Sequence, residues 1–330
     1  MAVTVNDVAR LAGVSPATVS RFLNKNAIVS PEASAAIHQA VTELGYDRSA
    51  TNRGRRPLGR THSDRRTSIL GMLIPNLRAD DVLEPVNGML LHGAESYARE
   101  HGYTFVVTRQ DEQGNLSQAI SGGAVDGIIA RSGTLNEDAV PRQVLIVWVF
   151  RPRGQFGRGD MVYPDSEGIG RLALDYLLQR KRHQLAVVYT PSLDIEAGLR
   201  VDAFVAAAAV AGHAVKVKCC EPAEIPACTA ALIEGRGRAD GLYLPVGDDV
   251  QLAALRTITC AGRKLGKDLD VMGCNNDIRR MRLTYPGIPN IDVRAAEIGK
   301  IAAGMLETRL KRPDEQWRRT VVGARLEVLE

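Results

Sequence analysis

Residues 3–24 read VTVNDVARLAGVSPATVSRFLN, and the rest of the chain is organised around this stretch. Two short helices are predicted in it. In the first, apolar residues recur at the spacing of one helical face, and Gly13 then ends the helix. Ser15 is a candidate N-cap of the second helix, and Pro16 takes the first helical position, where its missing N–H costs nothing. The second helix therefore begins three residues after the first has ended, as in a helix-turn-helix.

The second of these helices is predicted to bury Val19, Phe22 and Leu23 and to turn a small, hydroxyl-bearing and cationic face outward. Such a face fits the major groove of DNA. Capping and apolar periodicity alone are equally compatible with an ordinary helical hairpin. The outward residues are Pro16, Ala17, Ser20, Arg21 and Asn24.

The identity of the residues favours DNA binding over the plain hairpin. The run VNDVARLAGVSPATVSRFLN closely resembles the first two helices of the lac repressor (LacI/GalR) family of bacterial transcription regulators, including its D-V-A, A-G-V-S and T-V-S-R-x-L-N elements. The resemblance implies an all-α headpiece at residues 1–47. A third helix is expected after Ser30, which repeats the N-cap device with Pro31 at the first helical position.

Two classes of DNA contact are expected in this headpiece. Hydroxyl and amide side chains, together with backbone N–H groups at helix N-termini, would bind phosphates, although each hydroxyl could equally be plain helix surface. Pro16 and Ala17 can contact bases only by shape or through a thymine methyl group, which leaves Arg21 as the one bidentate reader of guanine. The candidate DNA contacts of the headpiece are Thr4, Val5, Ser15, Pro16, Ala17, Thr18, Ser20, Arg21, Asn24 and Ser30.

Residues 48–66 form an arginine-rich hinge, RSATNRGRRPLGRTHSDRR. Off DNA this is expected to be a solvated linker, and on DNA its arginines can neutralise phosphates or enter a narrow minor groove. The resemblance implies a hinge helix that wedges a leucine between base steps, but Arg55 stands at the aligned position. Either Leu58 replaces the wedge in a shifted register, or Arg55 reads the groove electrostatically. The candidate hinge contacts are Asn52, Arg53, Arg55 and Leu58.

The charge of the chain is concentrated at its N-terminus. The 330 residues carry a net charge of +4, and 45% of them are apolar, enough for two or three well-filled domains. Residues 1–66 hold ten Lys and Arg against five Asp and Glu, whereas the remainder holds 32 against 33. The excess positive charge therefore lies where a polyanion would bind.

The cysteine pattern and the absence of long apolar runs indicate the cellular compartment in which the protein is expected. The five cysteines are odd in number and lack C-x-x-C spacing, which favours a reduced protein. No signal-peptide pattern follows Met1, and no apolar run reaches the length of a membrane span. We therefore expect a soluble, cytoplasmic protein without a membrane partner.

Beyond residue 66 the pattern alternates between β-branched runs and amphipathic helices, which predicts parallel sheets covered on both faces. Two sheets are favoured over one because so many strands are expected. The strands are predicted at residues 69–75, 103–108, 125–131, 144–150, 185–190, 241–246 and 269–274, and the helices at 82–101, 168–180, 197–212, 250–262 and 295–310.

The family resemblance continues more weakly through SILGMLIPN, YPDSEGIGRLALDYL and ADGLYLPVGDDVQLAAL. It implies an α/β core of two periplasmic-binding-protein-like lobes, each built on a parallel doubly wound sheet, with a small molecule bound in the cleft. An effector-binding and dimerisation domain is thus expected at residues 67–330. By analogy, its N-lobe comprises 67–162 and 293–330, its C-lobe comprises 163–292, and the protein is a homodimer.

The resemblance also points to effector-binding residues. Arg200 lies where relatives hold an arginine that reaches into the cleft, and it would grip a carboxylate, a phosphate or sugar hydroxyls. Asp248 fits the acid of the family's N-D pair. Asn275 stands where relatives usually have an acidic residue, so it can still form hydrogen bonds but lacks the negative charge.

Aromatic and cationic residues near 150 are further candidates. Trp148 and Phe150 could stack on an effector and Arg151 or Arg153 could supply a cation, although Trp148 could equally be core. Relative to the family, acids are lost and arginines are kept around the predicted cleft. This weakens the case for a simple sugar as the effector and favours an anionic metabolite. The effector classes considered are a sugar, a sugar phosphate or sugar acid, and a purine-like compound. A cleft that has drifted and binds nothing is an open alternative.

The function predicted from the sequence is an effector-controlled repressor that acts as a dimer on a pseudo-palindromic operator. An α/β enzyme or a small-molecule-binding protein of the cell envelope are the competing classes. The sequence contains no phosphate-binding loop, dinucleotide fingerprint or G-x-S-x-G elbow, so no catalytic activity, cofactor or metal is expected.

Overall fold

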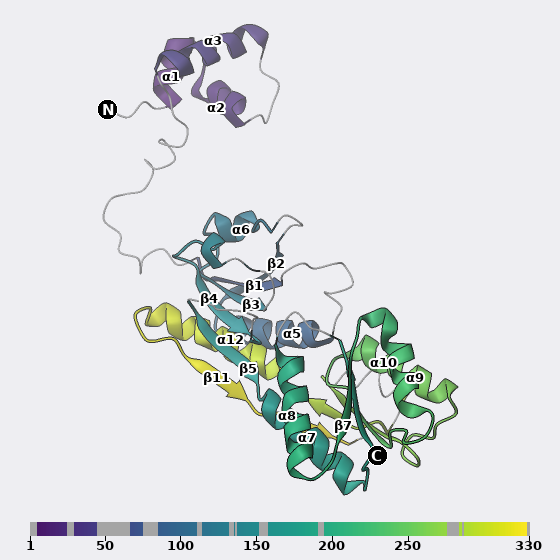
Figure 1. Cartoon of the computed structure of the whole chain (residues 1–330). Coiled ribbons are helices and arrows are strands. Elements are labelled where there is room, and N and C mark those ends of the chain that lie inside the picture. Colours follow the sequence, from purple (N-terminus) through teal and green to yellow (C-terminus); the bar gives the residue numbers. More distant parts are fainter. Residues whose placement is uncertain are drawn as a thin grey trace. The chain divides into compact units, whose positions relative to one another are not determined.

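The computed structural model divides the chain into two compact units, Met1–Arg65 and Arg66–Glu330 (Figure 1). The candidate DNA contacts Thr4, Asn52, Arg53, Arg55 and Leu58 lie outside the residues that the structure describes. The described residues are 5–24, 30–44, 67–74, 85–110, 114–131, 135, 137–151, 158–190, 195–275, 284–285 and 287–328.

The first unit contains the three predicted helices, α1 (Val5–Ala12), α2 (Pro16–Asn24) and α3 (Pro31–Glu43). Val8, Val19 and Ile37 are fully buried where the helices meet, and Val5 and Phe22 pack against this small core. The helical pattern deduced from the sequence is therefore confirmed for this unit.

The helix boundaries in the first unit follow the predicted capping chemistry. The Thr18 backbone N–H donates to the Ser15 hydroxyl at 3.1 Å, and the Ala33 N–H donates to the Ser30 hydroxyl at 3.3 Å. Gly13 adopts the left-handed region at φ 63°, where a side chain would be strained. This turn lets α2 start so soon after α1 has ended.

The second unit contains two six-stranded sheets. The first has the strand order β11-β5-β4-β3-β1-β2, and all its pairings are parallel. Its strands run over Ile69–Ile74 (β1), Thr104–Arg109 (β2), Gly127–Arg131 (β3), Leu145–Val149 (β4), Asp160–Pro164 (β5) and Arg319–Val322 (β11).

The second sheet has the strand order β12-β10-β9-β8-β6-β7. It is parallel except for the pair β10–β12, which is antiparallel. Its strands run over Leu185–Tyr189 (β6), Val215–Cys219 (β7), Gly241–Tyr243 (β8), Asp270–Cys274 (β9), Asn290–Asp292 (β10) and Arg325–Glu327 (β12).

Helices cover both sheets, and one buried apolar cluster extends through both lobes, from Leu70 and Val147 to Val187 and Met272. The α-helices are α5 (Pro85–Glu100), α6 (Gln118–Ser121), α7 (Ser166–Gln179), α8 (Glu196–Val210), α9 (Ile225–Ile233), α10 (Asp248–Cys260) and α12 (Ala295–Lys311). Two short 3₁₀ helices, η3 (Glu137–Ala139) and η4 (Pro222–Glu224), complete the described elements.

Glycines allow the helix pairs of the second unit to pack closely. A Cβ on Gly93 of α5 would lie 1.8 Å from the Ala296 carbonyl oxygen of α12, and one on Gly299 of α12 would lie 2.1 Å from the Leu90 carbonyl oxygen of α5. In the pair α7–α8, a Cβ on Gly170 would lie 2.3 Å from the Arg200 carbonyl oxygen. Backbone approaches backbone at these crossings, so the glycines fix how near the helices lie.

The structure differs from the expected lobes at the C-terminus. Residues 293–330 were expected to belong wholly to the N-lobe and both sheets to be parallel, but Arg325–Glu327 (β12) pairs antiparallel with β10 of the second sheet. β12 follows β11 after only two residues, Gly323 and Ala324, and pairs with β10 at the edge of the second sheet. The chain therefore passes between the lobes once more near its end.

Candidate functional site: recognition helix and interlobe polar cluster

The outward face of α2 carries the candidate base contacts. Pro16, Ala17 and Arg21 are exposed, whereas Val19 is fully buried, as the sequence predicted. The Ser15 and Thr18 hydroxyls hydrogen-bond each other at 2.8 Å at the start of the helix. The side chains of Ser20 and Asn24 lie outside the described structure, although their backbone belongs to α2.

A second group of polar residues lies where strands of the second sheet end. Arg200 extends from α8 and is 4% exposed. Its Nη1 atom donates to the Pro245 carbonyl at 2.7 Å, just after β8, and to Asn275 Oδ1 at 3.0 Å, just after β9. The two predicted effector residues Arg200 and Asn275 are thus brought into direct contact. In open α/β sheets, ligands bind at these carboxyl ends.

The remaining effector candidates are placed differently. Asp248 begins α10, and its side chain lies outside the described structure. Trp148 is 3% exposed and donates its indole N–H to the Arg158 carbonyl at 2.9 Å, which corresponds to the core alternative for this residue. Phe150 is also buried, with the Arg131 guanidinium 5.5 Å from its ring centroid.

Arg151, considered above as a free cation for an anionic effector, is engaged by two carboxylates. It follows β4 of the first sheet and bonds Glu196 Oε1 through its backbone N–H at 2.9 Å and through Nε at 3.0 Å. Its Nη2 atom donates to Glu196 Oε2 at 2.9 Å, and its Nη1 atom donates to Glu167 Oε1 at 3.3 Å. The charge of Arg151 is thus balanced by carboxylates of the chain itself, and its role as a cation for an effector stays a prediction.

This ion pair links the two lobes electrostatically. Burial alone would lower the pKa of Arg151, but the hydrogen bonds and charges of Glu196 and Glu167 raise it above its usual value. Burial would likewise raise the pKa of Glu167, yet Arg151 holds it below its usual value. The Ile195 N–H of the second lobe also donates to the Arg151 carbonyl at 3.2 Å. Arg151 is therefore bound to the start of α8 by backbone and side chain.

Ser166 joins this pair to the predicted effector residue Arg200. Its hydroxyl donates to Glu196 Oε2 and accepts from Arg200 Nε at 3.4 Å. We call Arg151, Ser166, Glu167, Glu196, Arg200 and Asn275 the interlobe polar cluster.

The sequence reasoning missed Ser166, Glu167 and Glu196 as members of this cluster. The one signal available was the spacing of Glu196 and Arg200, four residues apart on one helix. That spacing predicts an ion pair along α8, whereas the structure shows Glu196 bonded to Arg151.

The first sheet supplies a smaller polar group at its own strand ends. Arg131 ends β3 and donates to Oδ1 of Asn87, a residue of α5 that is 2% exposed. Neither residue was singled out from the sequence, because an arginine after a strand and an asparagine in a helix carry no signature alone.

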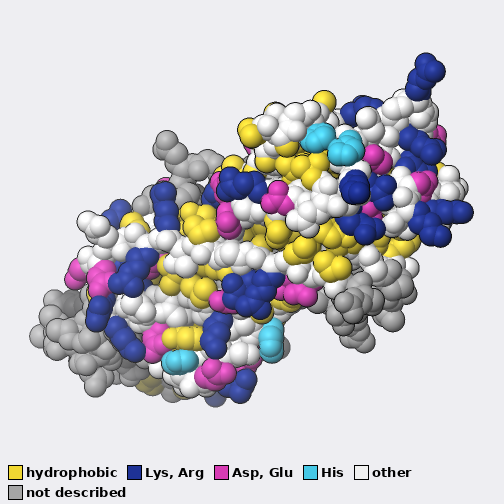
Figure 2. Space-filling model, turned by 90° about the horizontal axis from the view of Figure 1, so that it is seen from below, with side chains coloured by type: hydrophobic (Ala, Val, Ile, Leu, Met, Phe, Trp, Pro, Cys, Tyr) yellow, Lys and Arg dark blue, Asp and Glu magenta, His cyan; other side chains and the backbone are white. Residues whose placement is uncertain are grey.

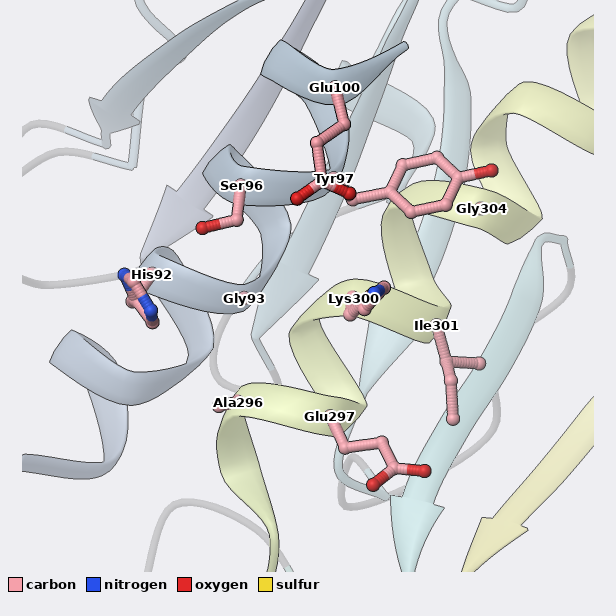
Figure 3. Close-up of a pocket in the computed structure, with 10 residues that line it drawn as sticks. All are labelled: His92, Gly93, Ser96, Tyr97, Glu100, Ala296, Glu297, Lys300, Ile301 and Gly304. Atoms are coloured by element: carbon pink, nitrogen blue, oxygen red, sulfur yellow. The ribbon is translucent and has the colours of Figure 1, made fainter.

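A separate pocket lies between α5 and α12 (Figure 3). Its volume is about 750 Å³. Its polar side chains come from both helices, namely His92, Ser96, Tyr97 and Glu100 of α5 and Glu297 and Lys300 of α12. None of the predicted effector residues lines it, so this pocket is distinct from the interlobe polar cluster.

Metal-binding clusters and membrane-spanning helices are absent from the described part of the chain. Nowhere in it do three or more His, Cys, Asp or Glu side chains gather closely enough to hold a metal ion. Among the same residues, no helix combines the length and apolar character that crossing a membrane requires. On the face shown in Figure 2, Lys and Arg side chains are interspersed with Asp and Glu.

A helix-turn-helix headpiece in one chain with a two-sheet α/β unit defines a class of protein, the DNA-binding regulators with a periplasmic-binding-protein-like domain. Residues 4–49 match the family described as bacterial regulatory proteins, lacI family, and residues 174–328 match the periplasmic binding protein-like domain. The chain thus joins a lacI-family helix-turn-helix domain to a periplasmic-binding-protein-like domain and is a DNA-binding transcriptional regulator.

Curated relatives match nearly the whole chain. A ribose operon repressor of Halalkalibacterium halodurans is 28% identical over 323 residues, covering 96% of this chain and 93% of the relative. The transcriptional repressor PurR of Aliivibrio fischeri is 25% identical, covering 96% of this chain and 94% of the relative.

Solved structures share the fold along the same length. A complex of the transcriptional regulator CelR with cellobiose has a TM-score of 0.68 at 23% identity and covers 99% of both chains. The lac repressor dimer bound to operator and the anti-inducer ONPF has a TM-score of 0.63 at 18% identity, covering 100% of this chain and 98% of the repressor chain. A LacI-family regulator of Enterococcus faecium with bound ribose has a TM-score of 0.66 at 20% identity, covering 79% of this chain and 97% of that chain.

Proposed function

We propose that this protein is an effector-controlled repressor that binds a pseudo-palindromic operator as a homodimer. The observation that carries the proposal is the exposed face of α2 in a headpiece that matches the lacI family. Pro16, Ala17 and Arg21 are available to base edges on that face, and Arg21 supplies the bidentate donor that guanine requires.

The headpiece favours a dimeric mode of binding. Among the residues that the structure describes, its apolar core contains five buried side chains, so one copy has limited stability. Two copies on adjacent half-sites would combine two weak contacts into one specific complex. The solved lac repressor dimer on operator supports this arrangement. The headpiece at residues 1–47, the hinge at 48–66 and the effector domain at 67–330 are part of the proposal.

The effector is proposed to bind at the interlobe polar cluster, with Arg200, Asn275 and Asp248 as contacts. Support comes from the direct bond between Arg200 and Asn275 at the strand ends of the second sheet. Relatives named for the ribose operon and structural neighbours with bound ribose or cellobiose support a sugar. Because PurR is among the relatives, a purine-like compound is the second candidate for the effector.

Control would follow from a shift between lobe arrangements. A ligand that binds one arrangement better than the other changes the population of both, and thereby changes the spacing of the paired hinges. A regulator of this kind meets its DNA in the cytoplasm, where we place it, and needs no catalytic step.

The DNA-binding part of the proposal is tested by footprinting the full-length protein on the DNA upstream of its own gene, across a salt series. We expect two protected half-sites related by a two-fold axis, with centres about 10 base pairs or a multiple apart. The affinity should fall steeply with salt because phosphate contacts release counterions. Binding that shows no preference for any sequence would contradict the proposal.

A further inference from the structure

A buried carboxylate, Glu196, begins α8 at the boundary of the two lobes. The residue is 1% exposed. Oε1 accepts two hydrogen bonds from Arg151, and Oε2 accepts one from Arg151 and one from Ser166. Such full pairing is expected, because a buried charge left unpaired is strongly destabilising.

We propose that Glu196 is a specificity-determining residue of the effector site, a built-in counter-ion of Arg151 that makes the site select an uncharged, hydroxyl-bearing ligand over an anionic one. The inference rests on the proposed function and deepens it by naming the chemical class of the effector.

The negative charge of Glu196 lies close to the positive charge of Arg200. Ser166 bonds both Glu196 and Arg200, so the Glu196 carboxylate lies two hydrogen bonds from the Arg200 guanidinium. Charges that are buried at such a separation are screened little by salt. Any ligand that reaches Arg200 therefore meets the field of Glu196.

The positive charge of Arg151 is balanced by carboxylates of the chain itself. Both described ion-pair partners of its side chain are carboxylates, the buried Glu196 and Glu167, whose side chain is 43% exposed, and its guanidinium also lies 4.6 Å from the centroid of the Tyr163 ring. An anionic ligand could bind Arg151 only by displacing Glu196 into an unpaired buried state or by lying beside it as a like charge. Both outcomes are unfavourable.

An uncharged ligand could hydrogen-bond with other members of the interlobe polar cluster. Asn275 is partly exposed and offers an amide that can donate and accept, whereas the one proton of the buried Ser166 hydroxyl is already donated to Glu196. The guanidinium of Arg200 can donate to a hydroxyl oxygen as well as to a carboxylate. Sugar hydroxyls can thus use the cluster without disturbing the Arg151–Glu196 pair.

The test removes the negative charge of the residue 196 side chain and keeps its shape. Glu196→Gln retains an oxygen that accepts from Arg151 but leaves Arg151 with only the half-exposed Glu167 as a described counter-ion. Thermal unfolding of the full-length variant is measured with inorganic phosphate and with sodium chloride of equal ionic strength. Phosphate should raise the unfolding midpoint of Glu196→Gln by several degrees more than that of the wild type, corresponding to at least tenfold tighter phosphate binding.

The matched control is Glu167→Gln, which removes the outer carboxylate of the same arginine. Because Glu196 remains in place, this variant should respond to phosphate as the wild type does. The inference is overturned by a wild type that gains as much from phosphate as Glu196→Gln, or by a folded Glu196→Gln that gains no more than the wild type.

Two additions keep the result interpretable. Glu196→Ser removes the same charge with a small side chain and carries the same expectation if the glutamine variant does not fold. The double variant Arg151→Gln, Glu196→Gln removes both charges and should lose the phosphate response again. Operator binding of each variant is measured separately, so failure of the inference is distinguishable from failure of the proposed function.

Discussion

At the scale of single residues, we propose Arg21 as the side chain that gives DNA recognition its sequence specificity. It is exposed on α2, while its neighbours at the start of that helix, Pro16 and Ala17, cannot hydrogen-bond to bases. Arg21→Ala should weaken operator binding by about 1–3 kcal/mol and relax the preference at one guanine position. Measuring the affinity for operators substituted at each position checks this.

Arg10→Ala provides the comparison for Arg21→Ala. Arg10 lies on α1, is highly exposed and pairs with Asp7 at 3.2 Å. We expect its loss to leave the base preferences unchanged. An equal loss of affinity on every DNA sequence in Arg21→Ala would instead identify Arg21 as a phosphate contact.

Tyr97 is a second residue with a measurable role, in stability. Its hydroxyl donates to Glu307 at 2.6 Å, and burial together with this carboxylate raises the pKa of Tyr97 to about 12. Tyr97→Phe should therefore lower the stability at pH 8 by about 1 kcal/mol. Thermal unfolding of both proteins measures the difference.

The pH dependence of that difference has a defined sign. A folded pKa above the unfolded value of about 10 gives stabilisation that is complete below pH 10 and is lost as the pH rises towards 12. The gap between wild type and Tyr97→Phe should shrink over this window. A gap that stays constant from pH 8 to 12 would show that the hydroxyl contributes nothing through its proton.

Single residues also show where sequence reasoning stops. Arg200 and Asn275 could be named because each stands in a run that resembles the family, and the structure joins them at 3.0 Å. The partnership of Arg151 and Glu196 could not be named, because it joins a strand end of one lobe to a helix start of the other. Such a pair depends on how the lobes meet, which no local pattern encodes.

At the scale of elements, the crossing of α5 and α12 depends on glycine. Gly93→Ala would place a Cβ 1.8 Å from a backbone oxygen of α12, so the helices must move apart. We expect a loss of about 1–3 kcal/mol in the free energy of unfolding. Denaturant unfolding of the full chain measures it.

Gly88→Ala on the same helix is the matched control. Gly88 is exposed, and a Cβ there meets nothing within 4 Å. The variant should be neutral or gain about 0.5–1 kcal/mol, because alanine is the better helix former. Equal destabilisation by both substitutions would mean that close packing at Gly93 does not limit stability.

The predicted elements divide according to how strongly their own residues specify them. Buried strands such as β1 and β4 are continuous apolar runs, and they were predicted within one residue or so. The edge strand β7 was missed because VKVKC is mostly exposed and alternates apolar with lysine. The three-residue strands β10 and β12 were missed because their pairing, not their composition, defines them.

At the scale of the whole molecule, charge is separated by unit. The excess positive charge falls in residues 1–66, whereas the larger unit is nearly neutral and, in its interlobe polar cluster, pairs Arg151 with carboxylates of the chain itself. Affinity for a polyanion therefore belongs to the N-terminal residues, and control of that affinity belongs to the larger unit. Effector control requires that the two be coupled.

Coupling between ligand and operator is therefore the most direct test of the central claim. We would measure operator affinity of the full-length protein with and without saturating D-ribose, cellobiose, their phosphates and purines. We expect one uncharged sugar to change the operator dissociation constant at least fivefold, and operator DNA to change the affinity for that sugar by the same factor. Specific operator binding that none of these compounds alters would contradict effector control and favour a cleft that is no longer used.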